Sequence, residues 1–152
     1  MRSMDKISIT AGVSKVLLIN GNNEVLILKN GVHKMSPHRS FRPDIPGGMV
    51  DPGESGHEAV MRELWEETGI QLKPADFALV YTGTAFYEKT NESVTKELYI
   101  ARTSDVPEVT LSWEHASYHW ASFDELRDGV DLSEFYIEAI AYMFKHDLFA
   151  AL

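Results

Sequence analysis

The segment between Gly47 and Gly69 limits what this chain can fold into more than any other part of it. The glycine pair Gly47-Gly48 and a turn signal at 51–53 precede a run, 57–68, that contains neither glycine nor proline. Adjacent glycines allow a tight turn, and a glycine after a helix adopts the left-handed conformation without steric cost. We therefore predict a short strand, a turn and a helix over residues 56–68 that ends at Gly69.

Three glutamates lie on one face of this predicted helix. Glu63, Glu66 and Glu67 are three and four positions apart, which at 100° per residue places them together. Val60 and Leu64 fall on an adjoining sector, where they can pack into a core. Like charges at this spacing repel by about a few tenths of a kcal/mol per pair, so we expect a compensating partner. A hard divalent cation, Mg²⁺ or Mn²⁺, prefers such carboxylate oxygens.

The residues around this helix resemble the Nudix box. The pattern is Gly48, five residues, Glu54, seven residues, Arg62-Glu63-Leu64, one residue, Glu66-Glu67, one residue and Gly69-Ile70, so every fixed position is present. The resemblance implies the Nudix fold, of the α/β class, with a mixed β-sheet sandwiched between helices. Since nothing in the composition marks a linker, we predict one domain over residues 1–152.

The resemblance also implies roles for residues of the box. Glu63, Glu66 and Glu67 would hold Mg²⁺, with Mn²⁺ as the alternative, and the carbonyl oxygen of Gly47 is a further candidate ligand. Glu66 and Glu67 are also candidate catalytic residues.

Other residues of the box are expected to support the glutamates. The forked guanidinium of Arg62 is placed to orient a glutamate through charge-assisted hydrogen bonds, which makes it a further catalytic candidate. Glu54 precedes the first helical turn, where a carboxylate favours the positive end of the helix dipole and is able to bond Arg62. Gly48 and Gly69 are expected to be structural, as glycines at turns.

A second acidic candidate lies outside the box, in the stretch 111–120. This stretch resembles the loop that carries an additional acidic residue in many Nudix enzymes, with an aromatic residue a few positions later. Glu114 matches that residue. The family position serves as a metal ligand or as the general base for the attacking water. The choice of general base between Glu67 and Glu114 stays open.

Substrate-binding candidates come from a local basic stretch and one tyrosine. The chain has a formal net charge of −9, yet residues 25–43 contain no acidic residue. Arg39 and Arg42 lie in this stretch, and guanidinium groups pair with phosphates through two hydrogen bonds. Tyr87 follows the box at a position where a tyrosine resembles a feature of dinucleoside-polyphosphate hydrolases. We expect these three residues to contact the substrate.

The remaining elements follow from apolar patterns and turn residues. We predict strands at residues 7–19, 24–28, 77–89, 93–102 and 118–121. The first two would form a hairpin. Ser122 and Glu125 have the spacing of a capping box that opens a short helix. A C-terminal helix is expected over 133–149, with apolar positions at Phe135, Ile137, Ile140, Ala141, Phe144 and Leu148.

Composition excludes several classes of protein. The acidic charge argues against a general nucleic-acid-binding surface, because such surfaces need Lys and Arg. The absence of cysteine excludes disulfides, thiolate metal sites and the cysteine-dependent isomerases of this fold. No run of about 18 apolar residues occurs, so we expect a cytoplasmic protein without a membrane partner. A homodimer stays open.

We therefore expect Mg²⁺-dependent hydrolysis of a phosphoanhydride bond in a nucleoside diphosphate-linked compound. A nucleoside triphosphate or a dinucleoside polyphosphate is the preferred small-molecule substrate. One alternative is an ADP-ribose or nucleotide-sugar pyrophosphatase, and another is a sensor that binds a nucleotide without cleaving it. The complete set of glutamates argues against the sensor.

Overall fold

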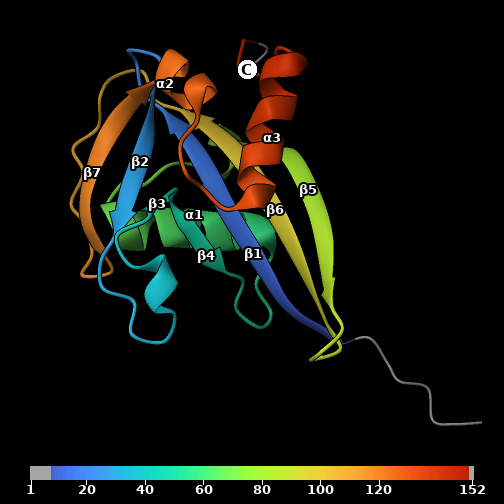
Figure 1. Ribbon diagram of the computed structural model, residues 1–152. Helices are drawn as coiled ribbons and strands as arrows, with labels where there is room; N and C mark the ends of the chain where they lie inside the picture. The colour runs from blue at the N-terminus through green and yellow to red at the C-terminus, as the bar shows by residue number, and fades with distance from the viewer. Residues whose placement is uncertain (1–7, 151–152) are drawn as a thin grey trace, which may run out of the picture.

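The computed structural model describes residues 8–150, so the predicted start of the first strand at Ile7 lies outside the described residues. In chain order its elements are β1 (Ser8–Ile19), β2 (Glu24–Asn30), η1 (Pro37–Arg39), β3 (Pro43–Asp44), β4 (Gly47–Met49), α1 (Gly56–Thr68), η2 (Pro74–Asp76), β5 (Phe77–Tyr87), β6 (Glu92–Arg102), β7 (His115–Ser122), α2 (Phe123–Asp128) and α3 (Glu134–Lys145). Figure 1 shows their arrangement. The helix predicted over 56–68 is present with the predicted bounds.

The strands form one mixed sheet, as predicted for this fold class. Its main order is β3-β2-β1-β6-β5, with β4 paired to β1 and β7 paired to β2. The parallel pair β1 and β6 runs from Ser8↔Glu92 to Ile19↔Arg102, whereas β5 and β6 are antiparallel. The two long central strands therefore provide the platform on which the helices and loops are placed.

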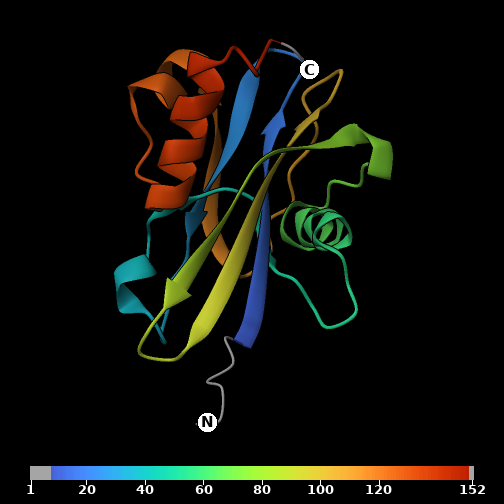
Figure 2. The same ribbon diagram turned by 90° about the vertical axis from the view of Figure 1, so that its right-hand side faces the viewer.

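Helices cover both faces of the sheet (Figure 2). On one face α1 packs over a cluster that includes Val16, Leu18 and Leu64. On the other face α2 and α3 cover a second cluster, which includes Leu17, Ile19 and Leu98. Because successive residues of a strand point to opposite faces, β1 supplies both cores with alternate side chains. The predicted sandwich of a mixed sheet between helices is confirmed.

The predicted hairpin of the first two strands exists, but its pairing is short. The antiparallel register of β1 and β2 is Ile19↔Val25, and the long partner of β1 is β6. Residues 16–19 are all completely buried. Such a continuous apolar run is typical of a central strand with both faces covered. The predicted hairpin is confirmed, and the longer parallel pairing of this strand with β6 was not predicted.

The C-terminal helix begins near its predicted start, ends at Lys145 instead of residue 149, and packs most of its predicted apolar face on the sheet. Its buried side chains are Tyr136, Ala139, Ile140 and Met143. Ile137 and Ala141, which were expected on the apolar face, are exposed. The other predicted positions, Phe135, Ile140, Phe144 and Leu148, do pack against the core, so helical spacing identified most of the buried face. In the described part of the chain, no helix has both the length and the apolar character needed to cross a membrane.

Candidate active site

Local interactions at both ends define α1, the helix that carries the three glutamates. At its start the hydroxyl of Ser55 accepts a hydrogen bond from the Glu58 N–H at 3.0 Å, and the Glu58 carboxylate accepts one from the Ser55 N–H at 3.1 Å. At its end Gly69 is left-handed, with φ 73°, and its N–H donates to the carbonyl of Trp65. These caps and the buried side chain of Leu64 hold the glutamates at set positions.

The glycine pair of β4 brings the backbone close to two of these glutamates. The Gly47 N–H donates a 2.8 Å hydrogen bond to Oε1 of Glu67. A Cβ atom at Gly48 would lie 2.8 Å from Cδ of Glu63, closer than real Cβ contacts allow. Gly47 has a φ of 142°, and a Cβ there would lie 2.2 Å from the carbonyl oxygen of Ser14. Gly47 therefore requires glycine, whereas a Cβ at Gly48 would displace the carboxylate end of Glu63.

The guanidinium of Arg62 connects three carboxylates of the box. It bonds Glu54 through Nε at 2.8 Å and Nη2 at 3.0 Å. Its Nη1 donates to Glu63 at 3.0 Å and to Glu66 at 3.2 Å. The hydrogen bond from Arg62 is the main reason why the pKa of Glu54 falls to about 2. Arg62 thus has the orienting geometry expected from its fork.

Glu67 is the most deeply buried carboxylate of this group, with 4% of its surface exposed. Burial raises its pKa to about 8, and the nearby charges of Glu63 and Glu114 act in the same direction. The Gly47 N–H and the ammonium of Lys15 oppose this shift. Nε2 of the buried His115 lies 3.7 Å from Oε2 of Glu67, too far for a hydrogen bond.

Glu63 shares this electrostatic environment. Burial raises its pKa, Arg62 opposes the shift, and Glu66 and Glu114 add to it. The carboxylates of Glu63, Glu67 and Glu114 therefore interact electrostatically with one another, in a site that disfavours their negative charge.

The donor set fits a hard divalent cation. A cation would relieve the repulsion among Glu63, Glu67 and Glu114, and carboxylate oxygens are the ligands that Mg²⁺ and Mn²⁺ prefer. Across residues 8–150, no three carboxylate or imidazole groups already stand in a metal-ligating arrangement. Two of the predicted ligands, Glu63 and Glu66, are instead turned toward Arg62. In this arrangement Arg62 orients both side chains.

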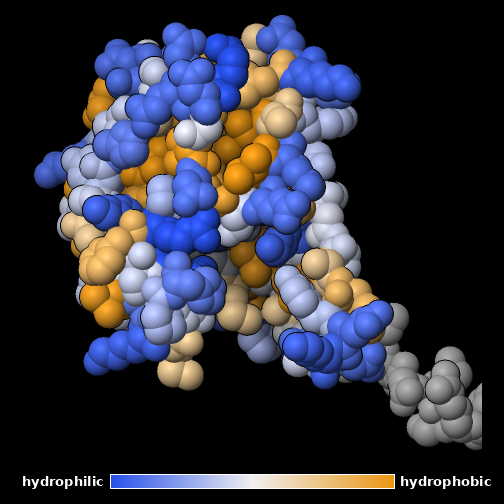
Figure 3. All heavy atoms as spheres, in the orientation of Figure 1, coloured by the Kyte–Doolittle hydropathy of each residue, from blue (hydrophilic) through white to orange (hydrophobic). Residues whose placement is uncertain are grey.

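A cavity of about 590 Å³ lies beside these carboxylates. Its walls come from β1, β4, the loop after β2, α1 and the loop before β7. In Figure 3 the surface is hollowed below the part that α3 covers, next to the loop that follows β2. The charged and aromatic side chains that line the cavity are Lys15, His33, Arg39, Asp44, Glu63, Glu67, Trp113, Glu114 and His115.

The predicted site residues divide between this cavity and other places. Glu63, Glu67, Glu114 and Arg39 line it. Glu66 does not line it and bonds Arg62. The structure does not bring two predicted substrate contacts to it. The guanidinium of Arg42 donates to the Asp131 carbonyl and carboxylate on the approach to α3. Tyr87 ends β5, opposite Glu92 at the tip of the β5–β6 hairpin.

Several residues of the cavity were absent from the sequence predictions. Lys15 is almost buried, and its ammonium bonds the Asp44 carboxylate at 2.5 Å. A lysine inside the apolar run of β1 was the available signal, because a buried charge needs a partner. Trp113 is 91% exposed, and His115 is buried with an Nδ1 atom that has no hydrogen-bond partner among the described residues. No sequence spacing links these four residues.

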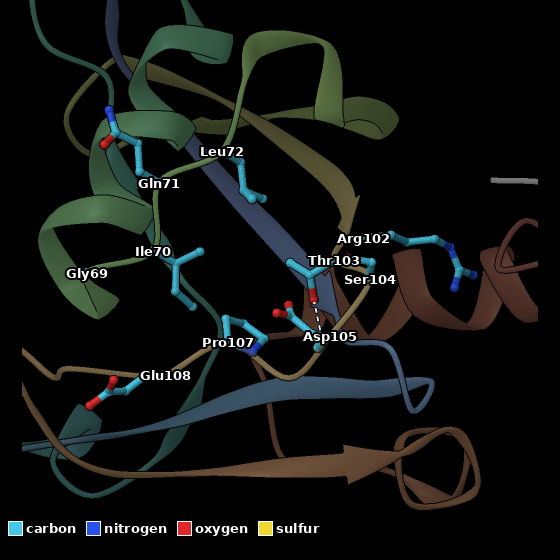
Figure 4. Close-up of a pocket in the computed structure, with 10 residues that line it drawn as sticks. All are labelled: Gly69, Ile70, Gln71, Leu72, Arg102, Thr103, Ser104, Asp105, Pro107 and Glu108. Atoms are coloured by element: carbon cyan, nitrogen blue, oxygen red, sulfur yellow. Dashed lines mark hydrogen bonds between the residues drawn. The ribbon is translucent and has the colours of Figure 1, made fainter.

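A second hollow, of about 430 Å³, lies between the end of α1 and the loop after β6 (Figure 4). Its charged residues are Arg102, Asp105 and Glu108, and the side chains drawn there do not converge on one point. It contains none of the box glutamates. The carboxylate cavity is therefore the candidate active site.

Comparison with known proteins gives consistent matches. The sequence profile of the NUDIX domain matches residues 10–141. The asymmetrical bis(5'-nucleosyl)-tetraphosphatase of Rattus norvegicus is 32% identical over 109 residues, which are 70% of this chain and 69% of that protein. The 8-oxo-dGTP diphosphatase of Escherichia coli K12 is 36% identical over 76 residues, 50% of this chain and 52% of that protein. The crystal structure of MutT protein from Methanosarcina mazei Go1 superposes with a TM-score of 0.76 at 26% identity, covering 95% and 99% of the two chains.

Proposed function

The chain belongs to the Nudix family of hydrolases, and we propose that it cleaves a phosphoanhydride bond in a dinucleoside polyphosphate or a nucleoside triphosphate, with Mg²⁺ as cofactor. The reaction class is that of the family, whose members act on acid anhydrides of nucleotides. One observation carries the proposal: a single cavity holds the carboxylates of Glu63, Glu67 and Glu114 together with the cations of Lys15 and Arg39. Carboxylates bind a metal ion, and cationic side chains bind anionic phosphates.

In this proposal Glu63, Glu66 and Glu67 hold the divalent ion, with the Gly47 carbonyl as a further candidate ligand. Nudix hydrolases generally use divalent metal ions. The bound ion would neutralise charge on the phosphate oxygens and make water a better nucleophile. Arg62 acts as a positioning residue, because it bonds Glu63 and Glu66 while Glu54 holds its other side.

A carboxylate of the cavity would accept the proton of the attacking water. Glu67 is one candidate, because burial raises its pKa to about 8 and brings it near the pH at which a base is efficient. Glu114 is the other, since it lines the same cavity from the opposite loop. The bond between phosphorus and the bridging oxygen breaks as water adds, and the products are two phosphate-ended fragments.

The dinucleoside polyphosphate is the first candidate substrate. The rat relative, whose printed activity is on bis(5'-nucleosyl) tetraphosphates, matches over more than two thirds of both chains. Trp113 adds support, because a tryptophan that is 91% exposed at the rim of this cavity offers an aromatic face to a nucleobase. A nucleoside triphosphate is the second candidate, favoured by the match to the 8-oxo-dGTP diphosphatase over half of the chain.

A substrate panel tests the proposal. The protein with Mg²⁺ is incubated with diadenosine tetraphosphate, nucleoside triphosphates, ADP-ribose and nucleotide sugars, and products are separated by anion-exchange chromatography. Asymmetric cleavage of the tetraphosphate into ATP and AMP is expected, with a higher kcat/KM than for the triphosphates. Glu67→Gln is the matched control for contaminating activity. Cleavage restricted to ADP-ribose or a nucleotide sugar would replace the proposed substrate, and tight binding without cleavage would favour a sensor.

A further inference from the structure

We propose that Lys15, Lys96 and Arg39 form an anion subsite for the part of a substrate's phosphate chain that lies beyond the carboxylates. The subsite lies on the sheet face below α3, outside the Nudix box. The subsite would select substrates with a long phosphate chain. This selection rests on the proposed hydrolysis of such substrates.

The order of the strands places Lys15 nearer to the glutamates and Lys96 one strand farther away. Gly47 of β4 approaches Glu67, and β4 pairs with β1 through Lys15↔Gly47. On the other side of β1 lies β6, where Lys96 pairs with Val13. Paired residues and residues two apart share one face of a sheet, so Lys15 and Lys96 both point toward α3. Lys96 is therefore one strand farther from the carboxylates, a step of about 5 Å.

The ring of Tyr136 at the start of α3 lies close to both lysines. The ammonium of Lys15 lies 5.6 Å from the ring centroid, and that of Lys96 lies 5.9 Å from it. The tyrosine hydroxyl is buried and has no hydrogen-bond partner among the described residues. A buried polar group without a partner is unfavourable in folded proteins. An anionic oxygen between the lysines and this hydroxyl would give it one.

The third cation comes from the loop on the other side of the cavity. Arg39 ends η1 and lines the cavity. It acts together with Lys15 to lower the pKa of Lys96, an effect in which burial is the largest cause. The charge of Arg39 also acts on the pKa of Tyr136, which burial raises and Arg39 lowers. Arg39 therefore faces the same cavity as Lys15, and its charge reaches Lys96 on the neighbouring strand.

Protein groups balance the charges of this cluster only in part. Asp44 pairs with Lys15. Across residues 8–150, the side chains of Lys96 and Arg39 form no ion pair and no hydrogen bond, and Lys96 contacts the rings of Phe135 and Tyr136. Cations that repel one another in a partly buried place are stabilised by an anion. A phosphate chain with one phosphate at the glutamates would bring its next phosphates over Lys15 and toward Lys96.

Direct binding of inorganic tripolyphosphate tests the subsite without hydrolysis. Isothermal titration in EDTA at low ionic strength compares the wild-type protein with Lys96→Met and Arg39→Gln. Methionine keeps an apolar stem against Tyr136 and removes the charge. Each variant is expected to weaken binding about tenfold, the effect of losing one charged hydrogen bond. Lys34→Met is the matched control, since Lys34 is an exposed cation of the same loop outside the cluster, and it should change the dissociation constant less than twofold.

A kinetic comparison gives a second readout. Lys96→Met is expected to raise the KM for diadenosine tetraphosphate about tenfold with kcat nearly unchanged, and to leave the KM for the two-phosphate substrate ADP-ribose within about twofold. Tyr136→Phe should weaken tripolyphosphate binding without lowering the melting temperature, because it removes a hydroxyl that has no partner in the free protein.

The outcomes separate the subsite from the proposed hydrolysis. Weaker tripolyphosphate binding in both variants, with no nucleotide cleaved by the wild type, supports the subsite and rejects the hydrolysis. Cleavage with unchanged tripolyphosphate binding in Lys96→Met and Arg39→Gln rejects the subsite. The subsite is also rejected if both variants lose no more affinity for tripolyphosphate than Lys34→Met does, or if the wild-type protein does not bind tripolyphosphate. Arg39 is exposed, so its variant tests the charge even if Lys96→Met fails to fold.

Discussion

The backbone N–H of Gly47 donates a 2.8 Å hydrogen bond to the carboxylate of Glu67, which joins β4 to the buried side of α1. This contact orients a carboxylate whose pKa is raised by burial to about 8. It places the carboxylate at a wall of the cavity that also contains Glu114. The glycine pair and the glutamate helix therefore act as one unit, although they are far apart in the chain.

Replacement of Glu67 tests its role in the reaction. Glu67→Gln keeps the shape and the acceptor oxygen for the Gly47 N–H, but it removes the negative charge and the proton acceptor. We expect kcat to fall about 10²- to 10⁴-fold with folding intact, as measured by steady-state kinetics and circular dichroism. Glu114→Gln is the comparison, and the variant that loses the acid-side rise of the rate with pH identifies the base. Near-normal turnover in Glu67→Gln would contradict its assignment.

The same carboxylate predicts a pH dependence of stability in the metal-free protein. Burial raises the folded-state pKa of Glu67 from 4.5 to about 8. A raised folded-state pKa contributes stability that is present below 4.5 and is lost as the pH rises toward 8. We therefore expect the melting temperature in EDTA to decline across this window, and to decline less in Glu67→Gln. Parallel curves for the two proteins would show that this carboxyl is not the cause.

Glu54 predicts the opposite sign at acid pH. Arg62 lowers the folded-state pKa of Glu54 to about 2, below the ordinary value of 4.5. A lowered folded-state pKa contributes stability that is present above 4.5 and is lost as the pH falls toward 2. Glu54→Gln should therefore reduce the acid-side decline in the free energy of unfolding, measured by urea denaturation at several pH values. Glu58→Gln, at the capping box of α1, controls for the general loss of a carboxylate.

Gly48 provides a steric test of the metal site. A Cβ at this position would lie 2.8 Å from Cδ of Glu63, so Gly48→Ala must displace that carboxylate. We expect the Mg²⁺ concentration for half-maximal activity to rise about tenfold or more, because groups that orient metal ligands commonly have effects of this size. Activity is titrated against Mg²⁺ and Mn²⁺, with chelated protein as the baseline. An unchanged Mg²⁺ requirement would show that Glu63 does not hold the ion in this orientation.

Trp113 provides a test of base recognition that does not disturb the core. Its side chain is 91% exposed, so Trp113→Ala should leave the melting temperature unchanged. Aromatic stacking on a base is worth about 1–3 kcal/mol, which predicts a KM raised about tenfold with kcat retained. Met35→Ala is the matched control, because Met35 is equally exposed and does not line the cavity. Equal KM values for the two variants would remove Trp113 from the binding site.

The local features of the box were predictable because neighbouring residues produce them. Helix spacing alone puts Glu63, Glu66 and Glu67 on one side, and Gly69 ends the helix through a conformation that few other residues adopt. The forked bonding of Arg62 to Glu54 is also local, because Glu54 lies directly before Ser55, the N-cap residue of the helix that carries Arg62. Such contacts depend on short stretches of backbone, which the order of residue types determines.

The substrate side of the cavity could not be predicted in the same way. Arg39 and Arg42 are three residues apart, yet Arg39 lines the cavity while Arg42 bonds Asp131 near α3. Tyr87 matched a family position, but the β5–β6 hairpin carries it to its tip. The direction of a loop side chain depends on the partners it meets after folding, and sequence spacing contains no information about them.

The amino-acid sequence by itself determined the helix of the glutamates, its end at Gly69 and the chemistry that three carboxylates favour. Only the tertiary structure decided which charges join them. Lys15 and Lys96 meet because β1 and β6 are parallel neighbours, a pairing between strands that are far apart in the chain. The physical reason is that hydrogen bonds between distant strands and burial of apolar faces select the packed arrangement. The cavity and its charge pattern exist only once that selection has been made.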